Sequence, residues 1–101
     1  MGERAQWTWD PEKDRANRRK HGLGFETAQL VFRDPLSLSR KDPSTHEDRL
    51  QTIGIVAGIL LFVVHTEPFL DNETTTNPGR IISARKATRR ERQAYEEGEI
   101  D

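Results

Sequence analysis

Residues Leu50–Thr66 read LQTIGIVAGILLFVVHT, a segment rich in apolar and β-branched side chains. Ala57-Gly58 divides the segment into two runs, Leu50–Val56 and Ile59–Thr66, each of a length typical of a strand. β-Branched residues favour extended backbone, and a glycine between two such runs favours a tight turn. The segment therefore predicts an antiparallel hairpin at the centre of a sheet.

Two helices and two short strands are predicted before this hairpin. Asp10 and Pro11 are typical of a helix start, and Gly22 ends that helix after residue 20 or 21. A second helix has apolar residues at helical spacing from Phe25, and Pro35 ends it because the residue before a proline disfavours helical geometry. Short strands are expected at Gln6–Trp9 and Leu36–Ser39, with a polar loop at Arg40–Arg49.

The chain after the hairpin begins with a long loop, Glu67–Gly79, which contains two prolines and a glycine. Alternating side chains then predict a strand at Arg80–Lys86. Thr88 and Glu91 form a capping box that begins a last helix, which continues to about residue 97. The order is β-α-α-β-β-β-β-α. It predicts one α+β domain over residues 1–101, with a small antiparallel sheet, two N-terminal helices and one C-terminal helix.

The composition excludes several classes of protein. The chain has 16 basic and 17 acidic residues, so it is not a uniformly basic nucleic-acid coat protein. It has no cysteine, which excludes disulfides, thiolate metal sites and cysteine nucleophiles. The three histidines are widely spaced, so no metal site is expected. No apolar run reaches the ~20 residues of a membrane span, and we expect a soluble, cytoplasmic protein without a cofactor.

Basic residues are concentrated around the last strand and the start of the last helix, at Arg80, Arg85, Lys86, Arg89, Arg90 and Arg92. A smaller cluster ends the first helix, at Arg15, Arg18, Arg19 and Lys20. Such segments can present a positive face to a polyanion, although solvated helix surface is the ordinary explanation for a charge run.

Three segments are specific enough to suggest a family: WDPEKDRANRRKHGLGFETAQLVFRDP from Trp9, LFVVHTE from Leu61 and RIISARKATRRERQAYEEG from Arg80. Together they resemble the BrnT family of ribonuclease toxins. The resemblance implies a RelE-like fold, RNA cleavage without a metal, and neutralisation by a BrnA-like antitoxin. It also implies that the toxin–antitoxin complex can bind operator DNA through the antitoxin. The Glu67–Gly79 loop departs from the family pattern, which has a tight turn there.

Metal-independent RNA cleavage suggests roles for four residues. The ribose 2′-OH attacks the adjacent phosphorus, which requires a base, an acid and cations around the phosphorane. His65 and Glu67 project from one face of a strand, and we predict that they share proton transfer. Arg85 and Arg89 are predicted to neutralise the phosphate. We expect these four to converge on one site, with further RNA contacts at Lys20, His21, Arg80, Lys86, Arg92 and Tyr95.

Other interpretations of these residues stay open. His65 is also typical of a core-edge histidine with a satisfied hydrogen bond. Glu67 could instead be a solvated strand end, or it could form a salt bridge to Arg85 that only fixes the sheet. Tyr95 could stack on a base or pack between helix and sheet. A function of a different class is a non-catalytic module whose basic strand–helix junction binds RNA or an acidic helix of another protein.

The Glu67–Gly79 loop is predicted to be dispensable for folding, because lengthening a loop costs only ~0.6 kcal/mol per doubling. It leaves its strand directly after His65 and Glu67, and it carries Asp71 and Glu73. We therefore expect it to adjust the access of a polyanion to the site.

Overall fold

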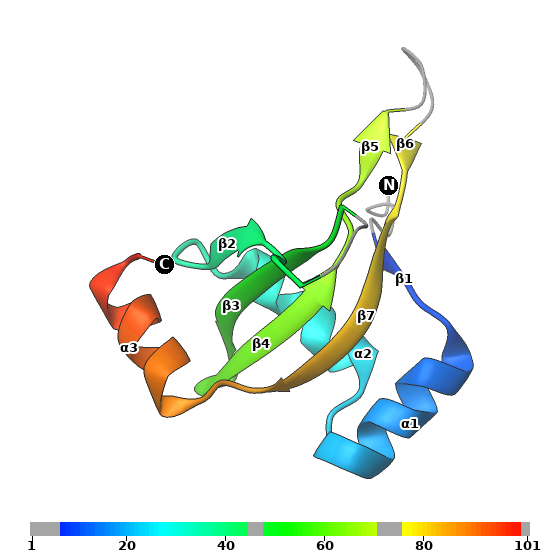
Figure 1. The fold of residues 1–101 in the computed structure, drawn as a ribbon. Helices are drawn as coiled ribbons and strands as arrows, with labels where there is room; N and C mark the ends of the chain where they lie inside the picture. The colour runs from blue at the N-terminus through cyan, green and yellow to red at the C-terminus, as the bar shows by residue number, and fades with distance from the viewer. Residues whose placement is uncertain (1–6, 45–47, 71–75, 100–101) are drawn as a thin grey trace.

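The predicted hairpin forms the centre of the sheet in a computed structural model that describes residues 7–44, 48–70 and 76–99 (Figure 1). Strands β3 (Leu50–Val56) and β4 (Ile59–His65) pair antiparallel along their whole length. Ala57 and Gly58 make the turn with φ values of 50° and 80°. Two successive positive φ angles are what a two-residue type I′ hairpin turn requires.

Three further strands extend the hairpin into a five-stranded sheet of order β1-β7-β4-β3-β2. Strand β2 (Leu38–Lys41) pairs antiparallel with β3, and β7 (Gly79–Lys86) pairs antiparallel with β4. Strand β1 (Trp7–Thr8) pairs with the start of β7 in parallel. The predicted antiparallel arrangement thus holds for four strands. The fifth strand, β1, is parallel to β7. After β1 the chain continues to β2 at the far edge of the sheet and then returns strand by strand to β7 beside β1.

The N-terminal helices lie where they were predicted. Helix α1 (Pro11–His21) begins at an Asp10 side chain that accepts a backbone hydrogen bond, and it ends at Gly22, which has a φ of 68°. The second helix consists of α2 (Phe25–Ala28) and a 3₁₀ turn, η1 (Gln29–Arg33). The 3₁₀ turn ends before Pro35, as expected, because a proline disfavours helical geometry at the residue that precedes it.

Helix α3 (Arg89–Glu97) begins with the predicted capping box, in which Thr88 and Glu91 each bond the other's backbone amide. Gly98 ends the helix with a φ of 75°. Among the described residues, no helix combines the length and the apolar character needed to cross a membrane.

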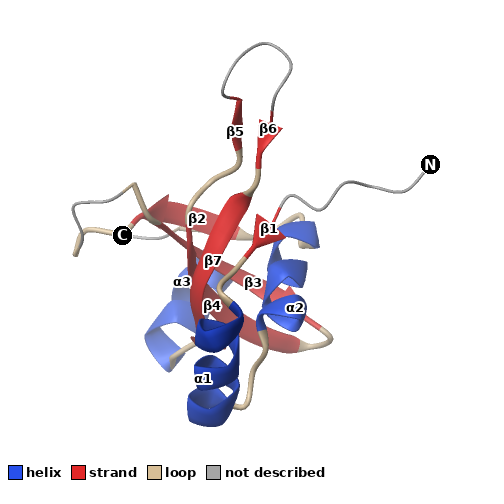
Figure 2. Cartoon of the chain, turned by 90° about the vertical axis from the view of Figure 1, so that its right-hand side faces the viewer, coloured by secondary structure: helices blue, strands red, loops and turns tan. Residues whose placement is uncertain are grey.

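The sheet buries an apolar cluster on each face, and Figure 2 shows α2 and α3 on opposite sides of it. One cluster joins Phe25 of α2 and Val31 of η1 to Leu61, Val63 and other residues of the sheet. The other consists of Ile53, Leu60 and Phe62, against which Tyr95 of α3 packs.

Asn17 joins α1 to the edge of β7. Its Nδ2 donates to the Ala84 carbonyl at 2.8 Å, and its Oδ1 accepts from the Ala84 amide at 3.2 Å. Nδ2 also donates to the Leu23 carbonyl at 2.8 Å. Strand β1 pairs only with Gly79 and Arg80, so the Asn17 carboxamide takes the place of a strand partner further along β7.

The predicted Glu67–Gly79 loop contains a small two-stranded sheet of β5 (Phe69–Leu70) and β6 (Thr76–Asn77). Both figures show this sheet protruding from the end of the main sheet. Phe69 is 57% exposed and fills no part of the core. Asp71 and Glu73, which were expected to influence access to the site, lie outside the described residues.

Candidate nucleic-acid interface

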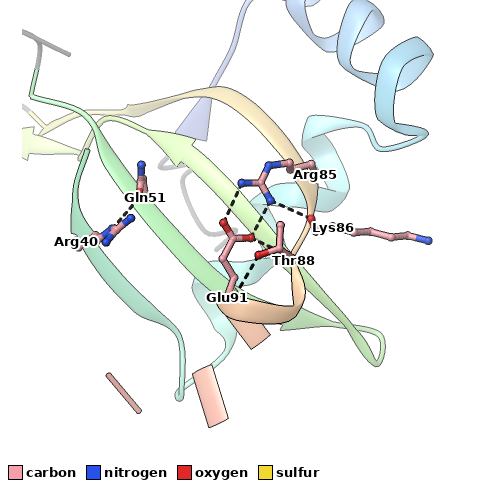
Figure 3. Close-up of polar contacts among 6 residues, drawn as sticks. All are labelled: Arg40, Gln51, Arg85, Lys86, Thr88 and Glu91. Atoms are coloured by element: carbon pink, nitrogen blue, oxygen red, sulfur yellow. Dashed lines mark hydrogen bonds and ion pairs between the residues drawn. The ribbon is translucent and has the colours of Figure 1, made fainter. Parts of the chain in front are cut away.

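Arg85 is fixed at the junction of β7 and α3 (Figure 3). Its Nη1 and Nη2 donate to the two carboxylate oxygens of Glu91, at 2.8 and 2.9 Å. Nη1 also donates to the Lys86 carbonyl at 3.2 Å, and the guanidinium carbon lies 4.2 Å from the centroid of the Phe62 ring. The Thr88 amide donates to the same Glu91 carboxylate at 2.8 Å. One carboxylate therefore both caps α3 and holds the Arg85 guanidinium in a single plane.

The Arg85–Glu91 pair is ionised at neutral pH. The hydrogen bond to Glu91 raises the pKa of Arg85 above its ordinary value. Burial would raise the pKa of Glu91, but hydrogen bonds from Arg85 and Thr88 outweigh it and hold that pKa below its ordinary value.

A groove of about 570 Å³ opens on the sheet face beside α3; we name it the sheet–helix groove. Ile53 and Phe62 of the central strands line it together with Arg40 of β2 and Arg90 of α3. The Nε of Arg40 donates to the Gln51 side chain at 2.8 Å, which holds the arginine beside the sheet (Figure 3). The lining thus contains two arginines, from β2 and α3, and two apolar side chains of the central strands. Three acidic residues of α3 and the segment after it also line the groove: Glu91, which is paired with Arg85, and Glu97 and Glu99.

A second groove, of about 750 Å³, lies at the other end of β7, where β5 and β6 leave the main sheet; we name it the end groove. Its charged and aromatic lining residues are Lys41, Asp48, Arg49, Glu67, Phe69 and Arg80. Two of these, Glu67 and Arg80, were predicted as site residues, and the structure places both away from Arg85.

His65 is buried, with only 2% of its surface exposed. Its Nδ1 lies 2.8 Å from the Thr66 carbonyl oxygen, which can only accept, so Nδ1 carries the proton. In the neutral ring Nε2 then accepts from the Thr52 hydroxyl at 2.6 Å, and Thr52 in turn bonds the Ser39 hydroxyl at 2.7 Å. Both ring nitrogens are therefore used within the protein, as in the core-edge interpretation of this histidine.

The expected convergence of His65 and Glu67 with Arg85 and Arg89 does not occur. His65 pairs with Ile81 at the start of β7, whereas Arg85 pairs with Phe62. Because β4 and β7 run antiparallel, the C-terminal end of β4, where His65 lies, is at the opposite end of the sheet from the C-terminal end of β7, where Arg85 lies. The two side chains also point to opposite faces, because His65 contacts the ring of Trp7 in the α2-side cluster and Arg85 lies over Phe62.

Most of the other residues predicted to contact RNA are exposed on the surface. Lys86, Arg89 and Arg92 are exposed around the β7–α3 junction, and Lys20 and His21 are exposed at the end of α1. Cations at the C-terminal end of a helix are favoured by its dipole, so Lys20 needs no ligand to explain it.

Tyr95 differs from these residues, because it is half-buried and its hydroxyl is bonded within the protein. It donates to Asp34 Oδ2 at 2.6 Å, and the same carboxylate accepts from the amides of Leu36 and Ile55. Burial would raise the pKa of Asp34, but these hydrogen bonds outweigh it and lower that pKa, while the bond to Asp34 raises the pKa of Tyr95. Tyr95 thus anchors α3 to the segment after η1.

From the sequence, Arg90 was identified only as a member of the basic cluster, with no place in a site. Arg40 in the sheet–helix groove was not identified, and neither were Lys41 and Arg49 in the end groove. Arg40 was assigned to a loop because the alternation from Leu36 was ended at Ser39. Extending that alternation would have placed Arg40 on the same face as Leu38 and identified it as a candidate.

Acidification below pH ~6.5 is expected to destabilise the protein through His65. Burial lowers the pKa of His65, although the Thr66 carbonyl and the Glu67 charge act in the opposite direction. As the pH falls through about 6.5, His65 of the unfolded chain takes up a proton while the folded ring stays neutral. The free energy of unfolding then falls by up to about 1.4 kcal/mol per pH unit until the folded ring is also protonated.

Urea unfolding between pH 7.5 and 5 measures this slope. The variant His65→Gln should be less stable at pH 7.5 and should lose the slope over that interval. An unchanged slope in His65→Gln would assign the pH dependence to another group.

The comparisons with known proteins identify the family. No group of three or more His, Cys, Asp and Glu side chains within the described ranges could hold a metal ion. No curated protein matches the chain. A family model described as ribonuclease toxin, BrnT, of type II toxin–antitoxin systems matches residues 9–91, which begin directly after β1 and extend into α3. Because the match covers most of the 101 residues, the chain belongs to the BrnT family of ribonuclease toxins of type II toxin–antitoxin systems.

Proposed function

We propose that the protein is an endoribonuclease that cleaves RNA in the sheet–helix groove without a metal, and that a BrnA-like antitoxin neutralises it. Membership of a ribonuclease toxin family supports the reaction and the existence of an antitoxin partner. The observation that carries the choice of site is the fixed Arg85 guanidinium beside a groove that contains two further arginines.

The proposed role of the arginines is to bind the scissile phosphate and stabilise the phosphorane. Arg85 donates three of its five N–H groups to Glu91 and Lys86 among the described residues, so two remain for a phosphate oxygen. Arg40 donates its Nε–H to Gln51, and the described part of the chain shows no partner for its terminal nitrogens, which are the groups proposed to contact the substrate. Donors that are already fixed in place need no reorganisation when charge develops in the transition state. Exposed Arg89, Arg92 and Lys86 extend the cationic surface for neighbouring phosphates.

Proton transfer in this proposal does not pass through His65, because that ring is buried and both of its nitrogens are bonded. The groove is open to water, which accepts the 2′-hydroxyl proton and protonates the departing 5′-oxygen. The products are a 2′,3′-cyclic phosphate and a free 5′-hydroxyl. The main protein contribution is then electrostatic, from arginine side chains.

The test is incubation of the purified protein with end-labelled RNA in EDTA. Cleavage that leaves 2′,3′-cyclic phosphate ends is expected. An RNA with 2′-deoxyribose at the scissile position is the matched control and should stay intact. RNA that is bound but not cut, with or without added magnesium, would instead support the non-catalytic binding module.

A further inference from the structure

We propose that the end groove binds a single-stranded stretch of the same RNA, beside the cleaved bond, and that one base stacks on Phe69. This inference rests on the proposed function, because it adds a second contact for the substrate. The sheet–helix groove would hold the scissile phosphate, and the end groove would hold the flanking nucleotides.

Phe69 is the first observation that supports an RNA base as the ligand. Among the described residues, four large apolar side chains are strongly exposed, and Phe69 is the aromatic one, at 57%. It lines the end groove together with Pro68 and Pro78, and the ring of Pro68 restricts the backbone directly before it. An exposed aromatic ring that fills no part of the core is the kind of surface on which single-stranded nucleic acids stack.

The charges around Phe69 are the second observation. Lys41, Arg49 and Arg80 reach this groove from three separate strands or their ends, so the fold brings together cations that are distant in sequence. The backbone at Arg80 is fixed by a 2.8 Å hydrogen bond from its amide to the Thr66 hydroxyl. Three cations and an aromatic ring that line the same groove suit a phosphate backbone with a stacked base.

The two carboxylates of the groove distinguish RNA from an acidic peptide. Asp48 and Glu67 line the groove together with the cations. A carboxylate repels phosphates and acidic side chains alike, but it accepts hydrogen bonds from the amino groups of bases, which an acidic peptide does not carry on its acidic side chains. The mixed charge of the groove therefore favours a nucleic acid that has both phosphates and base edges.

The spacing of the two grooves allows one RNA strand to reach both. Arg80 and Arg85 lie on the same strand, β7, and five residues of strand span ~17 Å. At roughly 3.4 Å for each stacked nucleotide, this distance corresponds to about five nucleotides. At this stacked spacing, a strand of three nucleotides spans less than the Arg80–Arg85 distance and a strand of eight spans more.

The experiment measures binding of 2′-O-methyl oligonucleotides, which cannot be cleaved because the 2′-oxygen is blocked. Fluorescence anisotropy is recorded for chains of three and eight nucleotides with the wild type, Phe69→Ala, Phe69→Trp and Leu36→Ala. Leu36 is 69% exposed and lines neither groove, so Leu36→Ala is the matched control. A thermal melt of each variant verifies that the fold is retained.

We expect the wild type and Leu36→Ala to bind the longer chain much more tightly than the shorter one. Phe69→Ala should weaken binding of the longer chain roughly tenfold, the loss of one stacked base, and Phe69→Trp should restore it. Lys41→Ala should lower the salt dependence by about one counterion. Equal binding by Phe69→Ala and Leu36→Ala would overturn the end groove as an RNA site. Because these probes cannot be cut, that result is independent of whether the protein cleaves RNA in EDTA.

Discussion

Replacing Arg85 by alanine is expected to lower the rate of RNA cleavage by about 100-fold or more. Removal of one fixed donor to a transition-state oxyanion costs ~10²–10³ in rate. Arg85 meets the requirement for such a donor, because Glu91 and the Phe62 ring hold its guanidinium at the junction of β7 and α3. Single-turnover cleavage of a labelled RNA at saturating enzyme measures the effect on the chemical step.

Glu91→Gln is the control for a purely structural role of Arg85. Both variants break the same ion pair, whose side chains are 36% and 20% exposed, so both should lower the melting temperature by only a few degrees. Glu91→Gln keeps the arginine and should retain cleavage within about tenfold of the wild type. Equal loss of activity in the two variants, in proportion to their loss of stability, would mean that Arg85 only braces α3.

Replacing Asn17 by alanine is expected to cost about 2–4 kcal/mol of folding free energy. The substitution leaves the Ala84 amide and carbonyl without partners at a position that is 1% exposed. Each buried polar group without a partner costs about 1–3 kcal/mol. It also removes the bond to the Leu23 carbonyl that closes the end of α1. Urea unfolding measures the loss.

Arg19→Ala is the matched control, because Arg19 is exposed on the same helix and exposed substitutions usually change stability by less than about 0.5 kcal/mol. Hydrogen exchange gives a local readout: the Ala84 amide of Asn17→Ala should exchange faster than its neighbours in β7. A loss of stability below about 1 kcal/mol, with slow exchange at Ala84, would show that the edge of β7 is held by other contacts.

Local sequence rules predicted most of the helices and strands, because the contacts that begin and end these elements join residues close together in the chain. The caps at Asp10, Gly22 and Thr88 act within one helical turn, and the Ala57-Gly58 turn acts between adjacent strands. The parallel pairing of β1 with β7 depends on contacts between segments distant in the chain, which no local pattern encodes. The role of Asn17 was missed for the same reason, since a single asparagine in a polar helix has no distinctive local pattern.

The candidate site was predicted less well than the fold, because a site depends on which ends of strands meet. The family resemblance indicated the correct class of activity, and Arg85 and Arg89 lie at the β7–α3 junction as expected. His65 was misplaced because an apolar strand followed by a histidine does not reveal whether the ring turns toward solvent or toward Thr52. Arg40 was not identified, because its place in the sheet–helix groove depends on β2 and α3 bordering the same groove, although they are distant in the chain.

The pairing of early and late parts of the chain also determines when the toxin becomes complete during synthesis. Asn17 and Ala84 are 67 residues apart, and at ~5–20 residues per second the ribosome adds the second roughly 3–13 s after the first. During that interval α1 and β1 have no sheet edge to bind. The strand that closes the fold also carries Arg85, and Glu91 of the helix that follows holds this arginine in place. The arginine is therefore fixed only after the last structural partner of α1 and β1 has been made. A chain that stops before β7 would have neither, and a partner that binds the chain during synthesis would meet an unfinished sheet.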